Sequence, residues 1–443
     1  MLGVSHPAEN PLVAEVIPMK TLPCLLPVLA CFALSVRAAD DLPRSWIDPE
    51  TGHRVVQLSK VGGTNSLYFT QYAYTAGGTK VVMEAPDGID LATLATGEIE
   101  RVYDGKLGPI IQVGRKSGDI YFTKDGFVCA LNPTTKQTRQ IAAIPEHGGI
   151  VTINSDETLL AGTVTEGAMD RTKLGPRLPP VPAGGYKPGE PVHGHDNYPD
   201  KIGMMTRRFK AHLPMVMFTL NIQTGERKDL VHDTEWLNHI QFSPTDPTML
   251  MFCHEGPWWM VDRIWTIRAD GKSQPQLIHQ RTMEMEIALH EYWSNDGQWI
   301  WYDLQTPKQE DFWVGGCNVY TGQHVRYHLT RDQWSIHYNS SPDGKLFSGD
   351  GCSSDVLYNS GSDQAKYMYL FHPSMLPVLE TPAGKDLIQV GTFQTEKLVS
   401  LANHHYSLEP NGNFSPDGKW LIFRSNMRGA IQVYAVEVAK AAP

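Results

Sequence analysis

The chain has 443 residues and a formal net charge of −10 at pH 7. This length is enough for a large buried core, and the acidic balance argues against a surface built to bind nucleic acid or another polyanion. Six cysteines are too few for a fold that depends on disulfide bonds, and the Cys-x-x-Cys spacing of structural zinc sites is absent.

The N-terminal residues predict an export signal. From Met19 the sequence reads MKTLPCLLPVLACFALSVRAAD, in which a lysine, an apolar run and two alanines precede Asp40. We therefore expect residues 1–39 to be removed, with Met19 as the natural start, and the protein to be periplasmic or secreted. The segment VLAC resembles a lipoprotein box, so a lipid anchor on Cys31 is the alternative. The apolar run is too short for a strong membrane span.

Residues 40–443 predict an all-β domain made of repeats. Seven segments share one order, in which a β-forming residue precedes a Ser/Thr-x-Asp/Gly-Gly type of turn and an alternating strand; they begin at Tyr74, Gly114, Ile153, Phe242, Trp293, Ser340 and Phe414. The clear copies are roughly 40–50 residues apart, which is the period of four-stranded propeller blades. We expect a single-domain, seven-bladed β-propeller, with a pair of β-sandwiches as the alternative.

Two features stand apart from the repeats. The segment 165–213 has a Pro- and Gly-rich core without strand alternation, LGPRLPPVPAGGYKPGEPVHGHDNYPD, and we expect a long loop inserted over one face of the propeller. Among the cysteines beyond the export signal, a bridge between Cys317 and Cys352 is permissible in an exported protein.

Histidines gather just before the repeat turns. The chain has 17, and five lie upstream of these turns, namely His239, His290, His337, His404 and His405. Equivalent positions in a propeller point toward the same central end, so these imidazoles would converge. Converging neutral imidazoles suit a first-row divalent metal such as Mn, Fe, Zn or Ni. One histidine alone is more often a packing or hydrogen-bonding residue, whereas a set in phase favours a site.

Other candidate residues lie between Trp236 and Leu304. Arg263, in the apolar segment VDRIW, needs an anionic partner. The two candidates for that partner are Asp262 and a substrate carboxylate. Trp258 and Trp259 fit either a stacking wall for a sugar ring or the blade core. Neither histidine-glutamate segment in this stretch has the HExxH pattern of a zinc protease. GxSxG, P-loop and GxGxxG motifs are absent, so serine-hydrolase, nucleotide and dinucleotide chemistry have no support.

Four segments resemble the oligogalacturonate lyases, a polysaccharide-lyase family with a seven-bladed propeller: HIQFSPTDPTMLMFCHEGPW, VDRIWTI, MEMEIALHEYWSNDGQWIWYDLQ and NHHYSLEPNGNFSPDGKWLIFRSNM. The resemblance covers almost all of residues 40–443. It implies β-elimination on short α-1,4-linked galacturonides with Mn²⁺ or another first-row divalent metal, giving an unsaturated uronate that rearranges to 4-deoxy-5-keto-uronate. Familiar family members act inside the cell, so export of this chain is a departure; an exported enzyme would act on digalacturonate before uptake.

The resemblance also implies roles for matching residues. His290, in ALHEYW, matches the base that removes the proton from C5. Arg263 matches the arginine that binds the substrate carboxylate. We expect His254, Trp258 and Arg208 to contact the substrate.

The implied metal ligands are less closely determined. His337 and the adjacent pair His404 and His405 match the metal-binding segments of the family, which also has a glutamine ligand. Asn403 and Gln394 are the candidates for the place of that glutamine. Adjacent residues on a strand point to opposite faces, so the choice between His404 and His405 stays open.

Two other classes of function compete with a lyase. A periplasmic TolB-like propeller that only binds partners shares the SPDG repeat but does not need histidines in phase. A propeller peptidase needs a serine nucleophile and usually an appended α/β domain, and no such segment follows the last repeat. We expect a small-molecule substrate, no nucleic acid, and no membrane insertion beyond a lipid anchor.

Overall fold

The computed structural model describes residues 44–75, 77–167, 201–352, 366–377, 387–406 and 408–441. The predicted export signal at 1–39, with Cys31, lies outside these residues, as does most of the insertion predicted at 165–213. The chain divides into two units, residues 1–42 and 43–443, and the description below concerns the second. In the described ranges, no helix is both long and apolar enough to cross a membrane.

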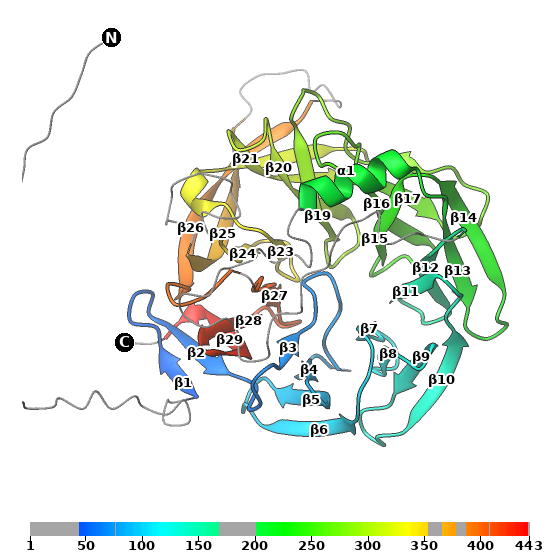
Figure 1. The fold of residues 1–443 in the computed structure, drawn as a ribbon. Coiled ribbons are helices and arrows are strands. Elements are labelled where there is room, and N and C mark those ends of the chain that lie inside the picture. Colours follow the sequence, from blue (N-terminus) through cyan, green and yellow to red (C-terminus); the bar gives the residue numbers. More distant parts are fainter. Residues whose placement is uncertain are drawn as a thin grey trace, which may run out of the picture. The chain divides into compact units, whose positions relative to one another are not determined.

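The regular structure of the described residues is almost entirely β-sheet, and the sheets follow one another in chain order around a common centre (Figure 1). Four of the sheets have four strands each. The first two of these sheets contain β3 (Asn65–Ser66), β4 (Lys80–Ala85), β5 (Gly88–Thr93) and β6 (Ile99–Asp104), and then β7 (Ile110–Val113), β8 (Ile120–Lys124), β9 (Phe127–Leu131) and β10 (Thr138–Ala143). The third contains β11 (Gly148–Ile153), β12 (Leu159–Thr165), β13 (Met215–Asn221) and β14 (Arg227–Asp233). The fourth contains β15 (Trp236–Phe242), β16 (Met249–Glu255), β17 (Ile264–Arg268) and β18 (Gln276–Leu277).

The next sheet has eight strands in two antiparallel halves. The halves are β19 (Ile287–Trp293), β20 (Trp299–Gln305), β21 (Phe312–Asn318) and β22 (His324–Leu329), then β23 (Tyr338–Ser340), β24 (Phe347–Gly349), β25 (Tyr367–Met375) and β26 (Gln389–Ser400). They are joined by a parallel pairing of β22 with β26. This repetition of four-stranded antiparallel units around a centre is an all-β, propeller-like fold, as the sequence repeats predicted.

The last sheet joins the two ends of the domain. It combines β1 (Ser45–Ile47) and β2 (His53–Gln57) with β27 (Asn413–Phe414), β28 (Trp420–Arg428) and β29 (Ala430–Lys440). The pairing of β2 with β29 sets Val55 opposite Val436, and both side chains are fully buried. Closure by non-local pairing removes sheet edges that would otherwise be exposed.

The predicted turn motif has a defined hydrogen-bond pattern. At Ser415, the side-chain hydroxyl donates to Asp417 at 2.6 Å and accepts from the amide of Trp420 at 3.0 Å. Gly418 follows at φ +70°, a conformation that glycine adopts without steric cost. The same Ser-x-Asp-Gly pattern closes the turns that begin at Ser294 and Ser341. The repeated letters in the sequence therefore correspond to repeated turns between first and second strands.

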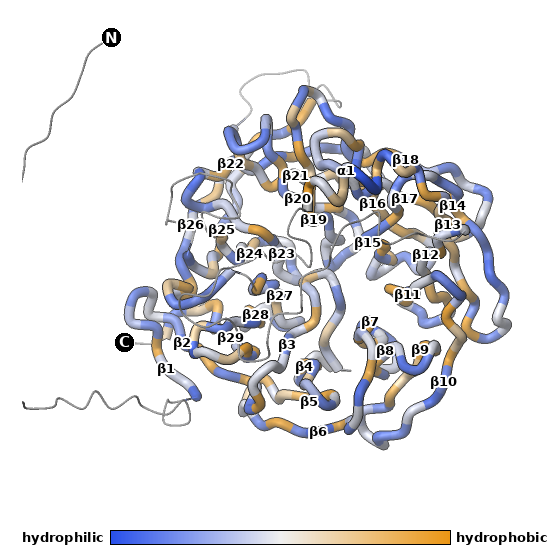
Figure 2. Tube along the Cα trace, viewed as in Figure 1, coloured by the Kyte–Doolittle hydropathy of each residue, from blue (hydrophilic) through white to orange (hydrophobic). Residues whose placement is uncertain are grey.

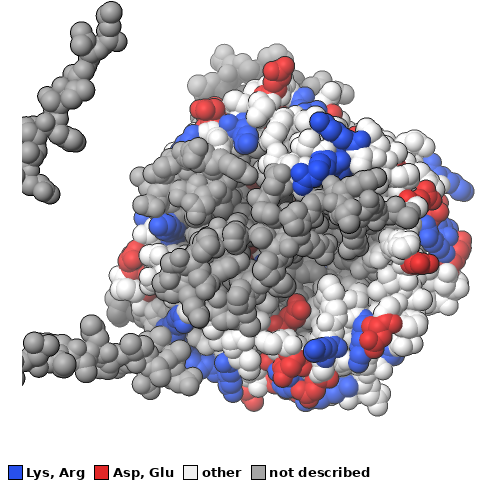
Figure 3. Space-filling model, viewed as in Figure 1, with Lys and Arg blue, Asp and Glu red and all other residues white. Residues whose placement is uncertain are grey.

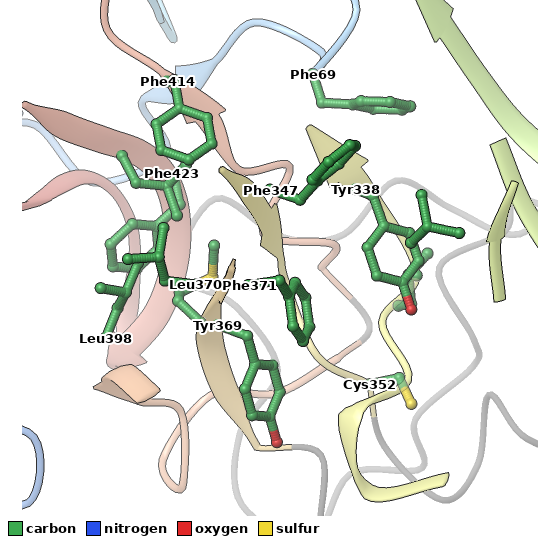
Figure 4. Packing of buried hydrophobic residues seen from close by; sticks show 14 of the residues in the cluster. Phe69, Tyr338, Phe347, Cys352, Tyr369, Leu370, Phe371, Leu398, Phe414 and Phe423 are labelled. Carbon is green, nitrogen blue, oxygen red and sulfur yellow. The ribbon is translucent and has the colours of Figure 1, made fainter. Parts of the chain in front are cut away.

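Face-to-face packing of neighbouring sheets explains the hydrophobicity of the strands. In β4, the consecutive residues Val81, Val82 and Met83 are all buried, because both faces of the sheet are covered. The outer strand β10 begins with three exposed residues, 138–140. Figure 2 shows this difference as hydrophilic colouring along the outer strands. Figure 4 shows part of this packing, in which Phe347 and Phe371 of one sheet belong to the same cluster as Phe423 of the next sheet.

Two expectations from the sequence need correction. The end of the insertion predicted at 165–213 is not an irregular loop, since it forms the helix α1 (Lys201–Ala211) before β13. A short 3₁₀ turn, Arg331–Gln333, precedes β23. The bridge between Cys317 and Cys352 is not formed, because both are buried free thiols.

On the face seen in Figure 3, acidic and basic side chains are interspersed around the periphery.

A glycine between two strands gives a direct test of the register of β11 with β12. A Cβ on Gly162 would lie 1.8 Å from the carbonyl oxygen of Gly149, so we expect Gly162→Ala to lower the free energy of unfolding by about 1–3 kcal/mol. Gly149→Ala is the matched control, because its Cβ meets no atom within 4 Å. Thermal and denaturant unfolding measure both. Equal stability of the two variants would contradict the register.

Candidate active site

Three histidines occupy the same place relative to three consecutive turns. His239, His290 and His337 each lie four residues before the serine whose backbone amide closes the turn, at 243, 294 and 341. Asn411 lies four residues before the corresponding Ser415. Of the five histidines predicted to be in phase, His239, His290 and His337 therefore are, whereas His404 and His405 are not.

A backbone irregularity directs two of these side chains. His239 has φ +49° and His290 has φ +48°, and each lies at a register shift in its strand, β15 or β19. A β-bulge inserts an extra residue and changes the direction of a side chain. Histidine tolerates the left-handed region better than bulky or β-branched residues. Both side chains keep about 20% exposure, at 20% for His239 and 21% for His290.

The three histidines meet around Tyr68, which lies between β3 and β4. The ring of His337 is 4.6 Å from that of His290, and the hydroxyl of Tyr68 lies 3.3 Å from Nε2 of His337. The ring of Tyr68 also approaches His239, with 6.3 Å between centroids. Burial, followed by the negative charge of Glu409 and Glu291, raises the pKa of Tyr68 well above its usual value. We call His239, His290 and His337 the histidine cluster.

Two buried aspartates hold members of this cluster. Nδ1 of His290 lies 3.1 Å from Asp303, and Nδ1 of His337 lies 2.8 Å from Asp350. A carboxylate at Nδ1 fixes the tautomer, so the lone pair is left on Nε2. Burial works against the charged form of His337, but Asp350 and Glu409 outweigh it and raise the pKa of His337.

Arg263 forms a buried ion-pair network beside the cluster. Its Nε donates to Glu291 at 2.8 Å and its NH1 donates to Glu255 at 2.9 Å, while only 3% of its surface is exposed. Nδ1 of His239 is 3.3 Å from Glu291. Burial opposes ionisation of Glu291, yet Arg263 and His239 hold the pKa of this carboxyl below its usual value. Burial also lowers the pKa of His239.

The sequence left two partners open for Arg263, and the structure shows a third arrangement. Asp262 pairs with Arg281 at 3.1 Å, so it is not the partner of Arg263. The two acids that bind Arg263 come from the end of β16 and from β19, and Glu291 directly follows His290. Contact of Arg263 with a substrate carboxylate stays a prediction, and it requires one of these ion pairs to open.

The His404–His405 pair lies in the connection between β26 and β27, not on a strand. Nδ1 of His404 contacts the hydroxyl of Ser425 at 2.8 Å, and Nε2 donates to the carbonyl of Leu408 at 2.8 Å. Since a carbonyl only accepts, Nε2 carries the proton. Burial lowers the pKa of His404 to about 3. His404 is thus a neutral, internally bonded residue here, and its assignment as a metal ligand stays a prediction that requires exchange of these bonds.

The backbone of His405 is fixed differently. Its amide donates to the side-chain oxygen of Asn426 at 2.8 Å, and its carbonyl accepts from the same side chain at 3.1 Å. This holds the connection against β28. The two candidates for the glutamine place, Asn403 and Gln394, are exposed, and Gln394 lies on β26.

The three predicted substrate contacts lie together near α1. Arg208, on α1, packs its guanidinium 4.1 Å from the ring centre of Trp236 and is 9% exposed. Trp258 packs against the cluster formed by two buried methionines of α1. His254, on β16, has one ring nitrogen 3.3 Å from Asp233 and the other 3.3 Å from Glu235. Their contact with a substrate stays a prediction.

One further carboxylate approaches the cluster. Glu409, in the connection before β27, lies 3.6 Å from Nε2 of His337. Within the described residues, no three side chains of His, Cys, Asp or Glu are placed to hold a metal ion. His337 and Glu409 are thus a pair of neighbouring donors.

Several functional candidates were missed from the sequence. Counting back four residues from each turn serine identifies the histidine cluster, but Tyr68, Asp303 and Asp350 lack such a signal. Glu291 was next to a predicted base, and its role depends on Arg263, which is 28 residues away.

The fold and this cluster define a propeller-like β protein with a histidine-centred site on its axis. A family model for oligogalacturonate lyase matches residues 207–442, which is more than half of the chain. The chain belongs to the oligogalacturonate lyase family.

Relatives agree with this membership. The oligogalacturonate lyase of Dickeya dadantii is 28% identical over 223 residues, which are 50% of this chain and 55% of that protein. The oligogalacturonide lyase of Pectobacterium atrosepticum is 26% identical over the same shares. The chain therefore aligns with about half the length of these relatives.

Solved structures share the fold over a longer range. An oligogalacturonate lyase in complex with manganese gives a TM-score of 0.69 at 19% identity and covers 89% of this chain and 96% of that one. The oligogalacturonate lyase of Vibrio parahaemolyticus gives 0.68 at 21% identity, with the same coverage.

The ion-pair network predicts a large effect of removing its cation. Arg263→Ala leaves Glu255 and Glu291 buried without their partner, so we expect the free energy of unfolding to fall by roughly 3–5 kcal/mol. Arg227→Ala is the control, since its pair with Asp229 is partly exposed and should be worth less than about 1 kcal/mol. Urea unfolding compares them. A loss below about 1 kcal/mol for Arg263→Ala would contradict the network.

Proposed function

We propose that this chain is an oligogalacturonate lyase that cleaves short α-1,4-linked galacturonides by metal-assisted β-elimination. The observation that carries the proposal is the histidine cluster, which lies on the axis of a chain that belongs to this family. A propeller that only binds partners has no need of several imidazoles in one place, held by buried carboxylates.

The reaction needs a base for the proton at C5, which is alpha to the substrate carboxylate. His290 suits this role because Asp303 holds its Nδ1, which leaves Nε2 as the basic atom, and because part of its ring is exposed. Transfer of the C5 proton to Nε2 accompanies formation of the C4–C5 double bond and cleavage of the bond from C4 to the leaving oxygen, which takes up a proton from solvent water to become a hydroxyl. His337 is 1% exposed and is less able to reach a substrate.

Arg263 stabilises this arrangement through its ion pairs with Glu255 and Glu291. By neutralising Glu255 and Glu291, it keeps two negative charges from facing an anionic substrate. Because Glu291 follows His290 on β19, this ion pair also fixes the backbone that carries the base. In this position Arg263 is a positioning residue, and it binds the substrate carboxylate only if one ion pair opens.

The donor chemistry beside the cluster fits a first-row divalent ion such as Mn²⁺. Nδ1 of His337 is held by Asp350, the outer partner that metal-binding histidines commonly have, and Nε2 faces Glu409. His337 and Glu409 would be ligands, with His405 from the same connection as a further candidate. A bound ion supplies positive charge that stabilises the carboxylate as C5 loses its proton.

We also propose that the fold has seven blades. The eight-stranded sheet counts as two of them, because one parallel pairing is all that joins its antiparallel halves. A crystal structure that showed the two halves as one continuous blade would overturn this count.

The lyase proposal predicts a metal-dependent optical signal. Metal-stripped protein mixed with digalacturonate should give no rise in ultraviolet absorbance, and added Mn²⁺ should start a rise from the conjugated product. No rise with digalacturonate or longer oligomers, with or without metal, would favour a TolB-like binding module instead. His290→Ala in the same assay should fold normally and lose at least about 100-fold in turnover, the lower range for a general base.

His147→Ala is the matched control for that variant. His147 also has a positive φ, +58°, and its side chain is 63% exposed. Its replacement by alanine therefore imposes a similar backbone strain and leaves the histidine cluster intact. Turnover of the control should equal that of the wild type. Retained turnover in His290→Ala would remove His290 as the base.

Export is a separate proposal, supported by the apolar run after Met19 and the two alanines before Asp40. Mass spectrometry of the mature protein should find an N-terminus at Asp40. An acylated Cys31 would establish the lipid-anchored alternative, and an intact N-terminus would contradict both.

A further inference from the structure

A cavity of about 310 Å³ lies further along the inner strands than the histidine cluster. Residues of the turns line part of it. The rest of its wall includes five polar side chains, one from each of five inner strands, and each lies two positions before the residue that begins the turn. Those five residues are Gln112, Thr152, Gln241, Asn339 and Asn413. Its volume is at the lower end of pockets that bind small organic molecules, roughly 300–1,000 Å³.

Phe69 separates this cavity from the histidine cluster. Its ring lies 4.6 Å from that of His337 and 5.9 Å from that of Tyr292, and Phe69 also lines the cavity. Its carbonyl accepts hydrogen bonds from Asn413 at 2.8 Å and from Asn339 at 3.3 Å. Figure 4 shows the Phe69 ring reaching in beside Phe347 and Tyr338. None of the three clustered histidines lines this cavity, so it is a site apart from the candidate active site.

The carboxamides of the cavity wall are fixed through their nitrogen atoms. Nε2 of Gln112 donates to the carbonyl of Ile153 at 3.0 Å, and Nε2 of Gln241 donates to that of Glu291 at 2.9 Å. Each bond joins one inner strand to the next. The side-chain oxygen of Gln241 accepts no hydrogen bond from the described residues, so it is a fixed acceptor for a ligand hydroxyl.

Arg115, which lines the cavity from the connection between β7 and β8, supplies a positive charge. Its guanidinium lies 4.2 Å from the ring centre of Tyr72, and no carboxylate of the described residues pairs with it. Two other arginines of the domain, Arg139 and Arg268, differ from Arg115 because each forms an ion pair with an aspartate. A guanidinium stacked on an aromatic ring keeps its edge free for a planar oxyanion.

We propose that this cavity binds a small hydroxylated carboxylate, such as a monomeric sugar acid. Arg115 binds the carboxylate, Tyr72 holds the guanidinium in place, and the carboxamide oxygen of Gln241 accepts from a hydroxyl group. The proposal stands on the cavity and not on the lyase reaction, although a uronate product of that reaction belongs to the same class of ligand.

Isothermal titration calorimetry of the metal-free full chain with D-galacturonate tests the site. The wild type and Arg227→Ala should bind one equivalent, and Arg115→Ala and Arg115→Gln should bind at least about tenfold more weakly, which corresponds to 1.4 kcal/mol. Galactose, which lacks the carboxylate, should not bind. Arg115 is exposed, so these variants should keep the wild-type fold, as circular dichroism checks.

Two outcomes would overturn the proposal. One is absence of saturable binding to the wild type at millimolar galacturonate, and the other is equal affinity in the Arg115 variants, which would place the binding elsewhere. The initial lyase rate should be unchanged in Arg115→Ala. If no variant or wild type shows lyase turnover but binding still depends on Arg115, only the proposed function fails.

Discussion

Packing of sheets face to face around a common centre is the constraint on which the site depends. Because every sheet is covered on both sides, the inner strand of each has one direction left for polar side chains, which is the axis. A residue at a given distance from the turn then reaches the same level in each sheet. His239, His290 and His337 meet for this reason, although about 50 residues separate each from the next.

The sequence predicted this geometry because the turns are local. A serine, an aspartate and a glycine within four residues determine the turn at Ser415, and the same pattern recurs at Ser294 and Ser341. All-β class, repeat period and histidines in phase follow from such short patterns. His404 and His405 were grouped with the others because they precede a turn, but they lie eleven and ten residues before Ser415, respectively, and fall in a connection instead of a strand.

The partners of Arg263 could not be predicted in the same way. Asp262 was the nearest acid in the sequence, whereas Glu255 and Glu291 come from two different sheets. A buried arginine takes the acids that the tertiary fold brings to it, because leaving any one of the three charges unpaired is costly. Tyr68 and Asp350 were missed for the same reason, since Tyr68 is 269 residues and Asp350 is 13 residues away from His337 in the sequence.

Phe69 lies between two groups of side chains of different character. On one side, histidines and carboxylates provide groups that can take up or release a proton. On the other, carboxamides and one arginine provide groups that keep their charge state and can only bind. The carbonyl of Phe69 is held by Asn339 and Asn413 while its ring packs on His337, so Phe69 forms a wall that contacts both groups. A ligand that moved this wall from the carboxamide side would therefore move it against the histidine cluster.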